Sequence, residues 1–157
     1  MKLLKKIAWA LLIVFVGMQF FRPETNTAEA GHLDAFLTET NPSQEVRLIL
    51  KQACNDCHSN QTIYPWYSNI APISYWMDEH IEHGKEELNF SEWATYKKKK
   101  KDHKLEELVE EVEEGKMPLN EYTWTHVDAK LTDGQIKALT DWAKRTRALY
   151  QIGERPQ

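Results

Sequence analysis

Residues 54–58, Cys54-Asn55-Asp56-Cys57-His58, hold both cysteines of the 157-residue chain. On a helical turn, side chains three positions apart lie on one face, so the two thiols are neighbours and a histidine follows them directly. This spacing matches the attachment motif of c-type haem, in which the thiols bond to the two vinyl groups of the porphyrin. The histidine is then placed to bind the iron as proximal ligand. The motif predicts one haem c, bound covalently by Cys54 and Cys57 and ligated by His58.

Three other uses of a cysteine pair are weighed against haem. A structural disulfide is common in exported proteins, but it leaves the adjacent histidine without a role. A redox-active dithiol of the thioredoxin type needs a preceding strand, and no strand pattern precedes Cys54. A zinc site needs more ligands, and the chain offers His80, His83, His103 and His126 without a second cysteine pair.

Met117 is the candidate for the second axial ligand of the iron. It precedes Pro118 and lies 59 residues beyond His58, after a predicted helix, and the segment resembles the Met-Pro ligand loop of small class I cytochromes c. A thioether ligand raises the reduction potential and suits electron transfer. The alternative role for Met117 is that of a flexible core residue. His80 is the alternative ligand because it falls on the apolar stripe of its predicted helix, where a histidine is more often a hydrogen-bonded core residue.

Aromatic side chains follow the motif closely. Tyr64, Trp66 and Trp76 are expected to form the wall of the haem pocket, where their bulk excludes water and so influences the reduction potential. Ordinary core packing is the alternative role for these residues.

Hydrophobic periodicity predicts helices and no strands. The expected helices begin at Asn41, run from Pro72 to near Gly84, open at Asn89 and continue into the lysines 97–101, run from about His103 to Glu114, and begin again at Thr132. The lysines are expected to form a solvated face. Gly115 and a capping box at Thr132 mark helix ends. The predicted fold class is all-α, a cytochrome c-like helical domain around one haem.

The first 22 residues differ from the rest of the chain. Lys2, Lys5 and Lys6 precede the apolar run 7–21, a composition typical of a signal peptide or signal anchor. The run is longer than most signal cores and shorter than most membrane spans, and we expect it to be a retained anchor, the alternative being cleavage that leaves the protein soluble in the periplasm. The positive charge before it predicts that the rest of the chain lies on the periplasmic side of the membrane.

These observations divide the chain into four parts. Residues 1–22 are the predicted signal or anchor, 23–40 a tether without fixed structure at its start, 41–152 the c-type haem-binding domain, and 153–157 a tail. Residues 1–22 hold four of the 20 basic residues and none of the 24 acidic ones, so the remainder carries a net charge of −8. An acidic domain of this kind does not suit nucleic acid as a partner.

Six stretches of the chain form a recognisable set. They are Gln19–Pro23, Cys54–Asn60, Tyr64–Tyr67, His80–Lys85, Leu88–Trp93 and Lys116–Leu119. Together they resemble the haem-binding domain proteins common in Bacteroidetes, short anchored chains with one CxxCH motif. The resemblance implies a periplasmic, membrane-tethered domain with a single haem, and it leaves the physiological partner open.

Two functions are expected from these residues. The first is a single-electron carrier with iron ligated by His58 and Met117, whose acidic surface would steer a basic redox protein. The second is a five-coordinate haem domain that binds a small ligand, senses it, or performs peroxidase-like chemistry with His80 or His83 as distal acid and base. The carrier is the main expectation, so enzyme activity is not expected.

Overall fold

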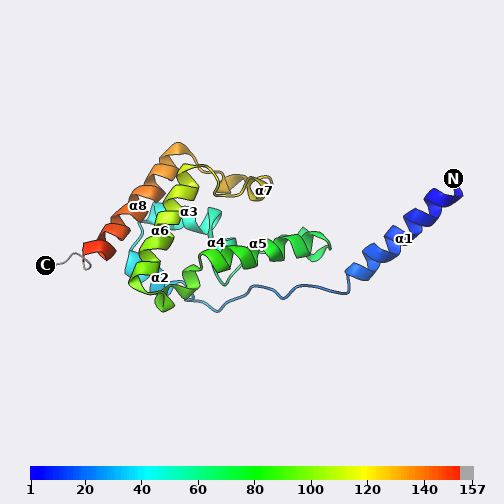
Figure 1. The fold of residues 1–157 in the computed structure, drawn as a ribbon, viewed down its shortest axis with the longest axis horizontal. Helices are drawn as coiled ribbons and strands as arrows, with labels where there is room; N and C mark the ends of the chain where they lie inside the picture. Colours follow the sequence, from blue (N-terminus) through cyan, green and yellow to red (C-terminus); the bar gives the residue numbers. More distant parts are fainter. Residues whose placement is uncertain (153–157) are drawn as a thin grey trace.

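Helices build most of the computed structural model, in which residues 1–152 are described (Figure 1). The α-helices are α1 (Lys2–Met18), α2 (Asp34–Thr40), α3 (Gln44–Ala53), α4 (Asn55–His58), α5 (Ile73–Glu87), α6 (Lys98–Glu113), α7 (Asn120–Thr123) and α8 (Asp133–Ile152). Three short 3-10 helices lie between them: η1 (Trp66–Asn69), η2 (Phe90–Thr95) and η3 (Val127–Ala129). The described residues contain no strand, so the all-α prediction is confirmed.

The hydrophobic core lies where α8 packs along α6 and α3, the first pair being side by side in Figure 1. Trp93, Leu105 and Leu139 are fully buried there. Apolar residues at helical spacing on α6 and α8 form the two facing stripes, because residues three and four apart share one face of a helix. The amphipathic helices predicted from periodicity are therefore the ones that build the core.

Residues 23–40 differ from the tether expected for them. The segment contains α2, and Phe36 on this helix is only 1 % exposed. Its ring stacks on Phe90 at 4.5 Å between centroids and meets Trp93 and Trp142 edge to face. One short helix has too few apolar residues to show a period, yet a single buried aromatic ring contributes about as much as several aliphatic contacts. Residues 34–40 thus belong to the domain.

The beginning of α3 also differs from the expectation. Asn41 was the expected start of this helix, but it ends α2 in the left-handed conformation, with φ of 41°. Asparagine tolerates that conformation better than most residues. Ser43 is the N-cap of α3, and its hydroxyl accepts a hydrogen bond from the Val46 amide at 3.3 Å.

Two further boundaries are shifted. Gly84 was expected near the end of α5 but lies inside it, one turn before Glu87. The lysines belong to the beginning of α6 rather than to the helix before it, and Lys101 is buried beside the Trp93 ring, with its Nζ 2.6 Å from Glu39. Phe90–Thr95 forms only the 3-10 helix η2.

Other predicted helix ends are confirmed. Gly115 follows α6 with φ of 69°, a conformation that glycine adopts without strain. Thr132 and Gln135 form the predicted capping box at α8: the Thr132 hydroxyl accepts from the Gln135 amide at 3.3 Å, and the Thr132 amide donates to Gln135 Oε1 at 2.9 Å. The expected tail, 153–157, lies outside the described residues.

Helix α1 extends away from the helical domain, to which residues 19–33 connect it (Figure 1). The side chains from Lys2 to Gly17 are exposed. None of the helices within residues 1–152 has the length and apolar character needed to cross a membrane.

Candidate functional site

The turn that carries the cysteines and the histidine is helix α4, which follows α3 almost without a break. Its first turn is closed by hydrogen bonds from the amides of Cys57 and His58 to the carbonyl of Cys54, at 3.2 and 2.9 Å. Both thiols are free and partly buried. Burial raises the pKa of Cys54 to about 12 and that of Cys57 to about 11. Thiols of this kind stay protonated at neutral pH, unlike the low-pKa thiols of redox-active dithiols.

The His58 ring is held by the end of helix α5. Its Nδ1 lies 2.9 Å from the carbonyl oxygen of Gly84 and 3.0 Å from that of Leu88. Carbonyl oxygens only accept, so Nδ1 carries the proton and donates it. Burial lowers the pKa of His58, which favours the neutral ring. The lone pair therefore resides on Nε2, which is the arrangement that a metal-binding histidine needs.

Helix α5 approaches the turn closely because residue 84 has no side chain. A Cβ placed on Gly84 would lie 2.7 Å from the Cys57 carbonyl oxygen and 3.0 Å from the Cys57 Cβ. Contacts that short do not occur in folded proteins, so any other residue here would push α5 away from the turn. The glycine is thus what brings the Gly84 and Leu88 carbonyls within reach of His58.

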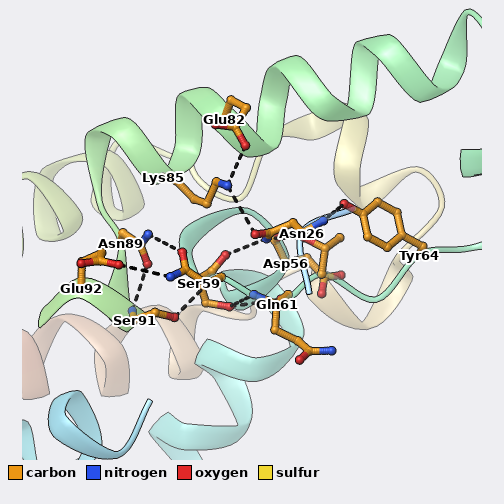
Figure 2. A network of polar contacts seen from close by, with 12 residues as sticks. Asn26, Asp56, Ser59, Gln61, Tyr64, Glu82, Lys85, Asn89, Ser91 and Glu92 are labelled. Atoms are coloured by element: carbon orange, nitrogen blue, oxygen red, sulfur yellow. Dashed lines mark hydrogen bonds and ion pairs between the residues drawn. The ribbon is translucent and has the colours of Figure 1, made fainter. Parts of the chain in front are cut away.

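A network of polar contacts fixes the segment before α2, here called the strap (residues 22–33), on the other side of the turn (Figure 2). The Asn26 side-chain amide donates to the Ser59 carbonyl at 2.8 Å and to the Thr62 hydroxyl at 2.9 Å. The Asn26 backbone amide donates to the Tyr64 hydroxyl at 2.8 Å. Lys85 reaches the side-chain oxygen of Asn26 from α5, at 3.3 Å. Asn26 therefore ties the strap, the turn and α5 together.

The same network continues to η2. The Ser91 hydroxyl accepts from the Asn60 amide at 2.9 Å and lies 2.8 Å from Nδ1 of His32 in the strap. The Asn89 side chain donates to Asn60 at 2.7 Å and accepts from the Ser91 amide at 3.0 Å. These bonds satisfy the polar groups just beyond the turn, as Figure 2 shows for Asn89 and Ser91.

Helix α7 contacts the turn from a third direction. The Tyr122 hydroxyl donates to the Asp56 carboxylate at 2.8 Å, and burial together with that charge raises the pKa of Tyr122. The Tyr122 ring stacks on His126 at 4.0 Å between centroids. Since Asp56 lies between the two cysteines, this bond ties the segment after Met117 to the turn itself.

Two cavities open against the turn. The first, here called the His58 cavity, has a volume of about 290 Å³ and contains Cys54, His58 and Met117 in its wall. The rest of its wall consists of Leu88, Phe90, Leu108 and Val112, with His83, Glu87, Lys104, Glu107 and Glu111. Met117 also packs against the hydrophobic core. His58 and Met117, the two predicted iron ligands, lie 59 residues apart in the sequence. The structure brings both of them to one cavity.

The second cavity, here called the Trp76 cavity, has a volume of about 300 Å³ and contains Cys57 in its wall. Trp76, His80 and Tyr122 also line it. The Nδ1 of His80 lies 2.8 Å from the Trp76 carbonyl, and its ring packs on the Trp76 ring at 4.6 Å. The structure therefore places His80, the alternative ligand, in a different cavity from His58.

The three aromatic residues expected in a pocket wall have different surroundings. Trp76 lines a cavity, Tyr64 holds the strap through Asn26, and Trp66 is 78 % exposed. Among residues 1–152 no three His, Cys, Asp or Glu side chains come together as a metal-ion site.

The sequence alone did not identify Asn26, Gly84 and Tyr122 as parts of this site. Gly84 carried a usable signal, since a glycine within a helical pattern often marks a close approach of two backbones. Asn26 and Tyr122 act through contacts with residues 33 and 66 positions away, and no local pattern signals such contacts.

One comparison with known proteins gave a match. A family model described as a haem-binding domain matches residues 13–145. That span contains every residue of the site, from the strap to α7. The chain matches no curated protein and no solved structure.

Proposed function

The chain belongs to the haem-binding domain family, and on this premise we propose that it is a c-type haem protein that carries single electrons on the periplasmic side of a membrane. Cys54 and Cys57 would hold the haem covalently, each thiol adding across one vinyl group of the porphyrin. His58 and Met117 would ligate the iron. When bound, haem supplies an iron that gains and loses one electron, which is the chemistry of a carrier.

The observation that carries this proposal is the orientation of His58. Its Nδ1 donates to the Gly84 and Leu88 carbonyls, so Nε2 is left as the ligand atom. Metal-binding histidines in general make this kind of bond from their second nitrogen. The residues present therefore fit a haem: two thiols on one turn, a preoriented imidazole, and beside them a cavity whose wall contains Leu88, Phe90, Leu108 and Val112 as well as charged side chains.

Met117 is the proposed second ligand because it shares the His58 cavity with the imidazole and Cys54. A thioether ligand favours a high reduction potential. His80 lies in the Trp76 cavity and is held by the Trp76 carbonyl. Its position supports the role of a packed helix residue.

We further propose the organisation expected from the sequence, with one change. Residues 1–22 would be an export signal or membrane anchor, and the haem domain would lie in the periplasm and exchange electrons with a basic redox protein. The change concerns the segment between them: α2 extends the domain towards its N-terminus, and the strap is bonded to the turn through Asn26.

A second function has one observation in its favour. His83 lines the same cavity as His58. If Met117 does not bind the iron, a histidine at that place can act as distal acid and base, and the domain would bind a small ligand or perform peroxidase-like chemistry.

The test uses the chain expressed together with cytochrome c maturation proteins. A denaturing gel stained for haem reports covalent attachment, and the stain is expected to disappear in Cys54→Ala with Cys57→Ala. Oxidised spectra then compare Met117→Ala with Met77→Ala, a matched methionine in the Trp76 cavity. The weak charge-transfer band from thioether to iron is expected to be lost only in Met117→Ala.

Two outcomes would count against the proposal. A wild-type chain that never stains for haem removes the covalent cofactor altogether. A stained chain with high-spin iron and no thioether band favours the second function, and His83→Ala then tests the distal histidine.

A further inference from the structure

Exposed apolar side chains lie in and beside the wall of the Trp76 cavity. We define the apolar rim as Ile63, Trp66, Ile73 and Trp124. Three of them line the cavity, and Trp66 packs edge to face against Tyr67, which also lines it. Trp66 is 78 % exposed and Trp124 is 74 % exposed. Soluble surfaces rarely gather large apolar side chains in this way unless another surface covers them.

The loop between α4 and α5 (residues 59–72) carries part of the rim and is bonded to the end of helix α1. The Gln19 side chain donates to the Ala71 carbonyl at 3.2 Å and accepts from the Ala71 amide at 3.0 Å. The Tyr75 hydroxyl lies 2.9 Å from the Met18 carbonyl. Ala71 is two residues from Ile73, so the end of α1 lies close to the rim.

The segment around α7 is joined to the same loop. The Tyr67 hydroxyl donates to the Thr125 hydroxyl at 2.9 Å, next to Trp124. In Figure 1, α7 and the beginning of α5 point towards the side of the domain on which α1 lies. The two segments that carry Ile73 and Trp124 are therefore joined through the loop that is bonded to the end of α1.

The two cavities have different borders. The His58 cavity is bordered by Glu87, Lys104, Glu107 and Glu111, which are suited to water or a charged protein. The wall of the Trp76 cavity contains Ile63, Ile73 and Trp124 of the rim, together with Asp56 and Glu121, and tryptophan is the residue most typical of the boundary between water and lipid. Helix α1 exposes apolar side chains along its length and has lysines at its far end.

We propose that the apolar rim lies in a lipid bilayer at the boundary between headgroups and acyl chains, beside the end of α1. The inference rests on the membrane location given under Proposed function. The continuity of the rim with α1 favours lipid over a protein partner. The rim then determines which face of the domain points to the membrane, and it leaves the charged border of the His58 cavity turned towards water.

The test is photolabelling of the full, haem-loaded chain in vesicles of phosphatidylethanolamine and phosphatidylglycerol. The vesicles contain a phosphatidylcholine with a diazirine on its acyl chain, and mass spectrometry locates the labelled residues. Label is expected on residues 1–21 and at Ile63 and Ile73. Leu149 on α8 is 67 % exposed and serves as the internal background.

A matched pair of variants completes the design. Trp66→Ser with Trp124→Ser is expected to lower the label at Ile63 and Ile73 several-fold while residues 1–21 keep theirs. Leu149→Ser is expected to leave the rim label unchanged. Both tryptophans are exposed, so the fold does not depend on them.

The other outcomes are distinguishable. Label on residues 1–21 with none above background at the rim overturns the inference, leaves the membrane location intact and frees the rim for a partner protein. A haem-stained chain without label on residues 1–21 overturns the membrane location and the rim proposal with it, while the haem site stands.

Discussion

Replacing Gly84 with alanine tests the contact on which the site depends. The added methyl group would lie 2.7 Å from the Cys57 carbonyl oxygen, and because that atom is backbone, α5 or the turn must move. Overpacking of this kind costs about 1–3 kcal/mol. Alanine gains about 1 kcal/mol over glycine inside a helix, which opposes the loss. We expect the free energy of unfolding to fall by roughly 1 kcal/mol, the difference between these two effects.

The movement has a second consequence at His58. If α5 shifts outward, the bonds from Nδ1 to the Gly84 and Leu88 carbonyls lengthen from 2.9 and 3.0 Å. A histidine whose Nδ1 donates less strongly is a weaker ligand through Nε2. In the haem-loaded chain we therefore expect a higher reduction potential in Gly84→Ala than in wild type.

Gly134→Ala is the matched control. Gly134 lies in the first turn of α8, and the nearest atom to an added Cβ is the Thr132 hydroxyl at 4.0 Å. This variant should gain up to about 1 kcal/mol from helix propensity alone and keep the wild-type potential. Urea unfolding and potentiometry measure both variants. If Gly84→Ala is as stable as Gly134→Ala and has the same potential, the close approach of α5 to the turn is refuted.

Two further predictions concern the strap and the histidine. Asn26→Ala should lower the free energy of unfolding by about 1–3 kcal/mol because it leaves the buried Ser59 carbonyl without its donor. Asn69→Ala, at an exposed position, is the control and should change this free energy little. Equal urea midpoints for the two variants would contradict the prediction. Burial lowers the pKa of His58 below the 6.5 of an unfolded chain, so the unfolded state takes up protons first as the pH falls. The contribution of His58 to stability is thus present above about pH 6.5 and lost below it. Urea unfolding of the haem-free chain at about pH 7 and about pH 5.5 measures this loss of stability. The control variant His103→Gln should show the same loss as wild type.

Local sequence patterns predicted the features that depend on neighbouring residues. The helical periodicity, the capping box at Thr132 and the left-handed Gly115 each involve residues within one or two turns of each other, and all three are confirmed. The haem-binding family was identified from the resemblance of six short stretches between Gln19 and Leu119, and it is confirmed by the match over residues 13–145.

Features that depend on distant contacts were missed. Gly84 was interpreted as a helix end because glycine commonly ends helices, but its actual role is set by a backbone 27 positions earlier in the chain, at Cys57. Residues 23–40 were interpreted as a tether because they include few large apolar residues, but polar bonds from Asn26 and the ring of Phe36 hold them against the domain. No local sequence pattern around Gly84 or within residues 23–40 indicates which distant residues they contact.

The C-terminal end of α5 has a role that follows from the helix itself. The last carbonyls of a helix lack donors within it and carry the negative end of the helix dipole. Leu88, which caps α5, directs its carbonyl at Nδ1 of His58, and so does Gly84 in the last turn, whose carbonyl also accepts from the Leu88 amide at 2.9 Å. The negative end of the dipole favours a proton on Nδ1 and increases electron density on Nε2, so α5 would make the imidazole a stronger ligand for the proposed haem iron. Because Gly84 also sets the distance between α5 and the turn, one helix end determines both the position of the His58 ring and the electron density on its Nε2.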